Sequence, residues 1–338
     1  MEWPERAVAA VTAVLVLVVV ACGGGGEDGA TSHAVRGETF RNPVYAGDFP
    51  DPFVLRVGDT YYAYATNGGG RNVRTLRSAD LVHWRRGPDA LPTVGPWGLE
   101  GKTWAPEVAR LVGRYVLVYT ADSSELFTQC IGRAVARSPA GPFVDGSEKP
   151  FLCQPDAGGS IDPSVFTDAD GTSYLLWKND GNSIGERTYL YAQRLSPDGR
   201  RLVGRRARLV ANDRQWEAMV VEAPTLWRHG GRYYLFFSAN AYATGLYAVG
   251  YATCTGPLGP CRDASENPIL TSRCRAVGPG HQAIVSDAEG RTWLVYHAWR
   301  SGAVGVDPPG RQLWLDRLVW HDGRPVVRGP TCGAQAAP

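Results

Sequence analysis

Residues 51–66, DPFVLRVGDTYYAYAT, consist of a short apolar run, a turn around Gly58 and a second run rich in tyrosine. Two such runs joined by a glycine-containing turn are typical of a β-hairpin. One hairpin would suit an ordinary β-sandwich, but a regular series indicates a repeat architecture. The arrangement returns four times, as APEVARLVGRYVLVYTA (105–121), DPSVFTDADGTSYLLWK (162–178), APTLWRHGGRYYLFFSAN (223–240) and HQAIVSDAEGRTWLVYHAW (281–299).

The spacing of the five copies predicts the fold. The steps from Pro52 to Pro106, Pro163, Pro224 and Gln282 are 54, 57, 61 and 58 residues. A third apolar run follows most hairpins, and a period in the fifties with three or four strands per unit is the size of a propeller blade. We therefore predict an all-β protein, in which residues 39–332 form a five-bladed β-propeller as a single domain.

The composition supports strands and tight turns and excludes a nucleic-acid-binding surface. Hydrophobic residues make up 44% of the 338 residues, and 41 glycines and 24 prolines favour turns over long helices. The formal net charge is +2, and the chain has no basic run that could follow a phosphate backbone. We expect a globular monomer with no nucleic-acid partner.

The N-terminal residues predict export. Residues 7–21 are an apolar stretch shorter than the roughly 20 residues of a membrane-spanning helix, but typical of a signal peptide. The sequence VVAC that ends at Cys22 resembles a bacterial lipoprotein box, so residues 1–22 are interpreted as a lipoprotein signal and 23–38 as a flexible linker. The protein would be lipid-anchored at Cys22 on the outer face of the membrane, or secreted. Because MEWPER is not positively charged overall, an ordinary cleaved signal or a misplaced start codon is the alternative.

The cysteine count agrees with export. Six cysteines remain after Cys22, and an even number in an exported chain predicts three disulfides, although six cysteines allow 15 pairings. Proximity in the sequence favours Cys130–Cys153 and Cys254–Cys261, which leaves Cys274 for Cys332. No cysteine has the spacing of a zinc site.

Three carboxylates lie close before a proline. Asp51 and Asp162 directly precede it, and one residue separates Glu222 from Pro224. The inner strands of a propeller line its central channel, and proline should hold the preceding residue extended. We therefore expect the three carboxylates to converge on one mouth of the channel. Crowded carboxylates differ in pKa, which glycoside hydrolysis requires of its acid and its base. Nucleophile elbows, metalloprotease motifs and phosphate loops are absent from the sequence.

DFPDPF (48–53), WAPEV (104–108), IDPSVF (161–166) and VEAP (221–224), in this order and at blade spacing, resemble glycoside hydrolase family 43. This family contains five-bladed arabinanases, arabinofuranosidases and β-xylosidases, and the resemblance covers nearly the whole chain after the predicted linker. It implies an inverting mechanism in which Asp51 is the general base, Glu222 is the general acid and Asp162 orients the acid. No cofactor is implied for the chemistry.

Three further residues, Trp104, Arg311 and His281, each allow two interpretations. Trp104 is a stacking platform for a sugar or a core residue, and Arg311 matches an arginine that reaches the sugar or is a surface ion-pair residue. His281 matches a channel histidine that helps to hold Ca²⁺ or Na⁺ with water, or is a hydrogen-bonded core residue. Glu107 follows its proline, so we expect it on the other face of the strand in a structural role.

The expected substrate is a pentose-containing oligosaccharide or polysaccharide, such as arabinan, arabinoxylan or xylan. The choice between arabinose and xylose, and between exo and endo action, stays open, with a lean toward arabinose. One alternative is a carbohydrate-binding lipoprotein without turnover. Another is a retaining five-bladed sucrose or fructan hydrolase, although the Asn-Asp-Pro-Asn-Gly context of those enzymes is absent from DFPDPF.

Overall fold

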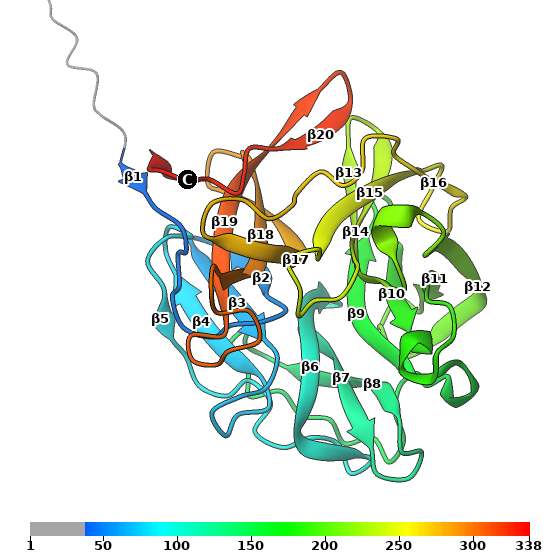
Figure 1. Ribbon diagram of the computed structural model, residues 1–338. Coiled ribbons are helices and arrows are strands. Elements are labelled where there is room, and N and C mark those ends of the chain that lie inside the picture. Colours follow the sequence, from blue (N-terminus) through cyan, green and yellow to red (C-terminus); the bar gives the residue numbers. More distant parts are fainter. Residues whose placement is uncertain (1–37) are drawn as a thin grey trace, which may run out of the picture. The chain divides into compact units, whose positions relative to one another are not determined.

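Five antiparallel sheets surround a central axis in the computed structural model, which describes residues 38–338 (Figure 1). The sheets follow one another around the axis in sequence order, and the fifth lies beside the first. This arrangement confirms the predicted five-bladed propeller. No helix within residues 38–338 is long and apolar enough to cross a membrane. The predicted signal peptide, Cys22 and nearly all of the predicted linker lie outside the described residues.

In each blade the strands follow one another along the chain from the inner strand outward. Blade 1 contains β2 (Phe53–Val57), β3 (Thr60–Ala65), β4 (Arg74–Ser78) and β5 (Arg85–Arg86). Blade 2 contains β6 (Gly98–Leu111), β7 (Arg114–Ser123) and β8 (Gln129–Ala136). Blade 3 contains β9 (Ser160–Thr167), β10 (Ser173–Asn179), β11 (Tyr189–Leu195) and β12 (Leu202–Ala211). Blade 4 contains β13 (Val221–His229), β14 (Arg232–Ala239), β15 (Ala248–Cys254) and β16 (Cys261–Asp263), and blade 5 contains β17 (Ala276–Ser286), β18 (Thr292–Arg300), β19 (Arg311–His321) and β20 (Arg324–Val327).

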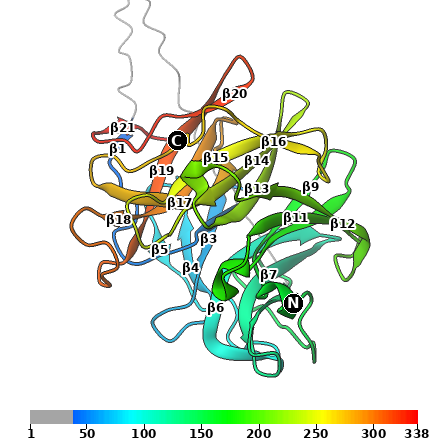
Figure 2. The same ribbon diagram turned by 45° about the vertical axis from the view of Figure 1, so that its right-hand side comes forward.

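Short elements complete the fold. Three 3₁₀ helices lie in loops: η1 (Pro155–Ala157) precedes β9, η2 (Gly181–Ile184) lies between β10 and β11 within the third blade, and η3 (Gln215–Glu217) precedes β13. Two-residue strands β1 (Thr39–Phe40) and β21 (Gln335–Ala336) pair with each other, and Figure 2 shows them side by side.

A separate hydrophobic cluster lies between each pair of neighbouring blades. Successive residues of a strand therefore pack against different neighbouring blades. In β10, Trp177 packs toward blade 2, whereas Leu176 packs toward blade 4. Because both faces of the sheets are buried, the strands read as nearly continuous apolar runs in the sequence.

The N-terminal segment closes the ring between blades 5 and 1. The amide of Val44 donates to the carbonyl of Leu313 on β19 at 2.9 Å, and the Asn42 side chain donates to the carbonyl of Leu315 at 2.8 Å. The β1–β21 pair then joins the two ends of the described chain, beyond the predicted boundary at residue 332. The disulfides Cys130–Cys153, Cys254–Cys261 and Cys274–Cys332 confirm the pairing that proximity favoured.

The prediction of an extended conformation before each proline is wrong. The residue at this position has a positive φ in all five blades: 54° at Asp51, 45° at Ala105, 53° at Asp162, 52° at Ala223 and 49° at His281. In the four inner strands with a paired residue on both sides, the pairing register shifts at the same place. An extra residue is accommodated there as a bulge, which turns the side chain out of the ladder.

Candidate active site

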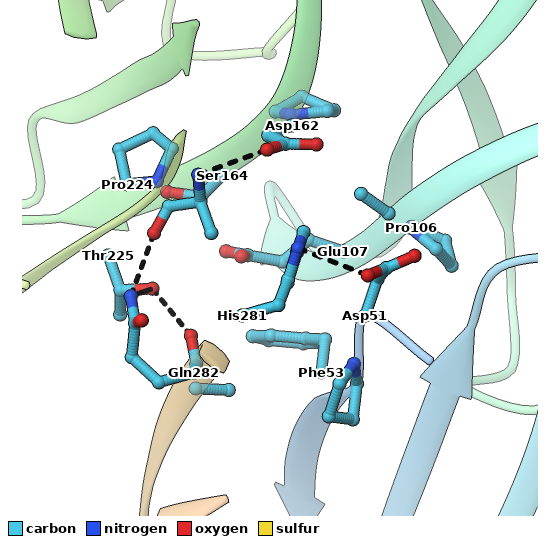
Figure 3. Close-up of a pocket in the computed structure, with 15 residues that line it drawn as sticks. Asp51, Phe53, Pro106, Glu107, Asp162, Ser164, Pro224, Thr225, His281 and Gln282 are labelled. Atoms are coloured by element: carbon cyan, nitrogen blue, oxygen red, sulfur yellow. Dashed lines mark hydrogen bonds and ion pairs between the residues drawn. The ribbon is translucent and has the colours of Figure 1, made fainter. Parts of the chain in front are cut away.

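The inner strands bring one position of every blade to a small cavity at the channel mouth. Figure 3 shows Asp51, Asp162 and His281 around this cavity, together with Glu107. These side chains come from β6, β9 and β17 and from the residue two places before β2. The cavity is also lined by the prolines or by Gln282, which replaces proline in blade 5. Residues more than 200 positions apart in the sequence are therefore neighbours.

A repeated hydrogen bond holds the positive-φ residue of four blades. In each, the backbone amide donates to a side chain on the second strand of the preceding blade, or on the residue just after that strand. The pairs are Ala105 to Thr66 at 2.9 Å, Asp162 to Thr120 at 3.2 Å, His281 to Ser238 at 2.8 Å and Asp51 to His297 Nδ1 at 3.0 Å. A non-glycine residue with positive φ costs about 1–2 kcal/mol, so this tertiary hydrogen bond stabilises a conformation that the local sequence disfavours.

Blade 4 departs from this pattern. The corresponding second-strand residue is Lys178, which has no acceptor atom to offer. The amide of Ala223 donates instead to Asp162 Oδ2 at 3.0 Å. One of the three predicted carboxylates therefore positions the backbone directly after Glu222.

Asp51 is surrounded by cationic and donor groups. Arg311 Nη1 lies 2.8 Å and His281 Nδ1 lies 3.3 Å from Asp51 Oδ1, and the Thr66 hydroxyl donates to Oδ2 at 2.5 Å. Burial opposes the charge, but Arg311, His281 and Thr66 outweigh it and hold the pKa of Asp51 well below its usual range. Asp51 is therefore ionised at working pH, as a general base must be.

His297 acts on Asp51 as a neutral ring. Its Nδ1 accepts the Asp51 amide hydrogen, so this nitrogen carries no proton, and its 3.4 Å approach to Asp51 Oδ1 is not an ion pair. Burial holds the pKa of His297 well below its ordinary value, in agreement with this tautomer. The proton is on Nε2, which is buried without a hydrogen-bond partner among residues 38–338.

The surroundings of Asp162 shift its pKa in the opposite direction to that of Asp51. Burial raises the pKa of Asp162 to about 6; the charges of Glu222 and Asp51 act in the same direction, and those of His281 and Lys178 oppose it. Because Glu222 and Asp51 both act on Asp162, the three carboxylates share one electrostatic environment.

Glu222 is held at both of its oxygens. The Tyr247 hydroxyl donates to Oε1 at 2.7 Å, and Lys178 Nζ donates to Oε2 at 3.2 Å. In the blade repeat Glu222 occupies the position of Trp104, one residue before the position of Asp51 and Asp162. The Glu222 carboxyl group thus comes from a different point of its blade than those of Asp51 and Asp162, and Glu222 is not among the residues that line the cavity.

The family model described as glycosyl hydrolases family 43 matches residues 40–325. The chain belongs to glycosyl hydrolase family 43. It is 28% identical over 304 residues to a xylosidase/arabinosidase of Butyrivibrio fibrisolvens, which covers 85% of this chain and 56% of that protein. It is 27% identical over 310 residues to an extracellular exo-α-(1→5)-L-arabinofuranosidase of Cellvibrio japonicus, which covers 83% of this chain and 86% of that protein.

Solved structures of the family agree with this fold. A thermostable family-43 glycoside hydrolase matches with a TM-score of 0.80 at 32% identity, over 89% of this chain and 99% of that chain. An endo-1,4-beta-xylanase of Bacteroides thetaiotaomicron matches with a TM-score of 0.72 at 30% identity, over 87% and 97% of the two chains. The chain nevertheless spans little more than half the length of the Butyrivibrio relative.

The remaining predicted residues of this family 43 chain occupy different places. Arg311 forms an ion pair with Asp51, lies over the Tyr242 ring, 4.9 Å from its centroid, and has a side chain that is 16% exposed. Trp104 is partly buried on β6 and pairs with Thr120. The side chain of His281 lies at the cavity, against Asp51.

The expectation that Glu107 points away from the channel is wrong. Glu107 lines the same cavity as Asp51 and Asp162, and its Oε1 accepts the Val165 amide at 2.8 Å. Glu107 stands two residues after Ala105, the position that Asp51 and Asp162 occupy in their blades, and residues two apart on a strand share a face, so the expectation of an opposite face miscounted the alternation. Burial raises the pKa of Glu107 to about 8.

The sequence reasoning missed three groups that hold the carboxylates: Thr66, Tyr247 and Lys178. Thr66 and Tyr247 lie after a strand and in a loop, where no pattern marks them. Lys178 carried a signal, because a lysine ends the apolar run SYLLWK in a chain with only three lysines among 35 basic residues. A charged residue inside a buried strand is rare unless it is paired.

Proposed function

We propose that this protein is an inverting glycoside hydrolase that cleaves α-L-arabinofuranosyl or β-D-xylosyl linkages in plant cell-wall polysaccharides. The observation that supports it most is the difference between the carboxylates at one channel mouth. Arg311 and His281 hold the pKa of Asp51 well below its usual range, as a base requires, whereas the pKa of Asp162, on which the charge of Glu222 acts, is raised. Named relatives from the same family act on arabinosides and xylosides.

In the proposed reaction, Asp51 accepts a proton from a water molecule that attacks the anomeric carbon. The bond between that carbon and the glycosidic oxygen breaks, and Glu222 donates its proton to the leaving oxygen. Asp162 keeps the backbone after Glu222 in place through the Ala223 amide. An inverting reaction requires the base and the acid on opposite sides of the sugar, about 6.5–9.5 Å apart, to leave room for water.

Substitution of the acid tests this function. Glu222→Gln keeps an acceptor for Tyr247 but has no proton to give, so kcat on phenyl α-L-arabinofuranoside is expected to fall by roughly 10²–10⁴-fold. Circular dichroism should show a folded protein. Full activity of Glu222→Gln would remove Glu222 from the mechanism.

Substrate choice and product size need a separate measurement. We propose pentose polymers, with arabinose-containing chains preferred, because the Cellvibrio relative is named for α-(1→5)-linked arabinofuranose. Product analysis on debranched arabinan, arabinoxylan and xylo-oligosaccharides decides the question. Single pentoses indicate exo action, and oligosaccharides indicate endo action.

Export of the protein and a cation in the central channel are two further parts of the proposal. We propose export as a monomer, with a lipid anchor at Cys22, supported by the N-terminal sequence and by extracellular relatives. Residues 38–338 contain no group of three His, Cys, Asp or Glu side chains that could hold a metal. A Ca²⁺ or Na⁺ ion in the channel would therefore take His281 as its one protein ligand and complete its shell with water.

A further inference from the structure

Lys178 occupies the one position where the fivefold pattern of the propeller is broken. Thr66, Thr120, Ser238 and His297 each accept the amide hydrogen of the next blade's positive-φ residue. Lys178 pairs with Ile161 as Ser238 pairs with Glu222, so the position is equivalent. The side chain nevertheless accepts nothing and instead donates to Glu222 Oε2 in the next blade.

The lysine is a buried cation. It is 1% exposed, and its Nζ lies 3.2 Å from Glu222 Oε2 and 3.4 Å from Asp180 Oδ1. Burial disfavours the ammonium, but Glu222, Asp180 and Asp162 outweigh it and raise the pKa of Lys178 above its ordinary value. The group therefore carries a positive charge next to the candidate acid.

Stabilisation of the fold does not explain why a lysine occupies position 178. A buried ion pair is weak evidence for stability, because removal of two charges from water offsets most of their attraction. A threonine at the same place would complete the hydrogen-bond pattern, as it does at Thr66 and Thr120. With Lys178 present, the Ala223 amide depends on Asp162 for its acceptor.

We propose that Lys178 is a positioning residue of the glycosidase reaction, which stabilises the carboxylate that Glu222 becomes when its proton passes to the leaving oxygen. The inference rests on the proposed function. In the structure Glu222 accepts hydrogen bonds at both oxygens, as the carboxylate that follows the transfer does. In the acid form that precedes the transfer, Asp180 is the remaining anionic partner of the ammonium. As the glycosidic bond breaks, its electron pair goes to the leaving oxygen, the proton of Glu222 binds there, and Oε2 gains the charge that faces Lys178.

The other groups around Glu222 do not replace this charge. Tyr247 donates a neutral hydrogen bond to Oε1, and Asp162 on β9 and Asp180 after β10 are acids themselves. Lys178 is thus the cation that contacts Glu222 among residues 38–338. Its loss should slow those substrates whose leaving oxygen needs a proton, and spare those whose leaving group departs as an anion.

The test compares Lys178→Met with the wild-type protein on two glycosides of the same sugar, phenyl and 2,4-dinitrophenyl α-L-arabinofuranoside. For Lys178→Met, kcat/KM is expected to fall roughly 100-fold on the phenyl glycoside and less than about threefold on the dinitrophenyl glycoside. Lys178→Thr restores the acceptor of the other blades and should show the same contrast with a native melting temperature. Lys149→Met, at an exposed lysine, is the matched control and should leave both rates unchanged.

Two results would overturn the inference. Equal losses on both glycosides would mean that the lysine only maintains the shape of the site, and wild-type rates for Lys178→Thr on both would mean that it has no role in catalysis. In the Glu222→Gln background, Lys178→Met should cause no further loss on the phenyl glycoside. A wild-type protein that hydrolyses neither arabinofuranosides nor the matching β-D-xylosides would instead refute the proposed function, which separates the two failures.

Discussion

At the scale of single residues, the carboxyl groups of one cavity differ in protonation state because they differ in burial and in neighbouring charges. Arg311 contacts Asp51 and helps to hold the pKa of this carboxyl group well below its usual range, so Asp51 is ionised at working pH. Asp162 and Glu107 are buried with less compensation, and the pKa of both is raised. The side chains that line this cavity thus include Asp51, which is ionised, Asp162, whose pKa is about 6, and Glu107, whose pKa of about 8 keeps it protonated near neutral pH.

Glu107 provides a test of this electrostatic picture. A carboxyl with a higher pKa in the folded state, here about 8, contributes stability below its unfolded pKa of about 4.5, and this contribution is lost as the pH rises toward 8. Glu107→Gln keeps the acceptor for the Val165 amide without a charge. The difference between 4.5 and about 8 corresponds to roughly 4 kcal/mol at pH 8, so we expect this variant to raise the free energy of unfolding by up to about 4 kcal/mol near pH 8 and to change it little near pH 4.

Urea denaturation at the two pH values measures this difference. The midpoint for Glu107→Gln should exceed that of the wild-type protein only at the higher pH. An equal shift at both pH values would mean that the effect comes from packing and not from ionisation.

The sequence predicted the site at this scale only in part. Asp51, Asp162 and Glu222 were predicted from the prolines that mark them; Asp51 and Asp162 line one cavity, and the charges of Asp51 and Glu222 both act on Asp162. Lys178 and Tyr247 were not found, because their contacts with Glu222 cross from one blade or loop to another. A sequence pattern within one blade cannot show which side chain of the next blade it meets.

At the scale of the strand, the bulge before each proline connects the fold to the site. The hairpins themselves could be predicted from alternating runs and glycine turns. The positive φ could not, because the local preference before proline is extended, and the hydrogen bond that overrides it comes from the preceding blade.

Thr120 tests the inter-blade hydrogen bond. Thr120→Val removes the acceptor of the Asp162 amide and leaves a buried N–H without a partner, which should cost about 1–3 kcal/mol of unfolding free energy. Thr120→Ser keeps the hydroxyl and serves as the control, with a smaller loss expected. Chemical denaturation of both variants gives the comparison, and equal losses would show that the methyl group, not the hydrogen bond, is responsible.

At the scale of the whole molecule, regular repeats made the five blades predictable. Closure of the ring was not predictable, because β1 and β21 contain two residues each and have no periodic pattern. The Cys274–Cys332 disulfide ties the residues before β17 to the segment that leads to β21, across 58 residues.

This disulfide should stabilise the fold more than the short one. The Cys254–Cys261 pair spans only seven residues, and loop entropy predicts a difference of about 2 kcal/mol between the two. The double variants Cys274→Ser/Cys332→Ser and Cys254→Ser/Cys261→Ser, compared by thermal unfolding, test this expectation. A larger loss for the short pair would show that local packing outweighs chain entropy.

The stereochemistry of hydrolysis tests the central claim, that Asp51 activates water while Glu222 protonates the leaving oxygen. Proton NMR of phenyl α-L-arabinofuranoside, recorded from the first moments of hydrolysis by the wild-type protein, shows which anomer forms before mutarotation. Because the proposed mechanism inverts the anomeric carbon, we predict that β-L-arabinofuranose appears first, or α-D-xylose if the β-D-xyloside is the better substrate. Initial release of the anomer with retained configuration would contradict it.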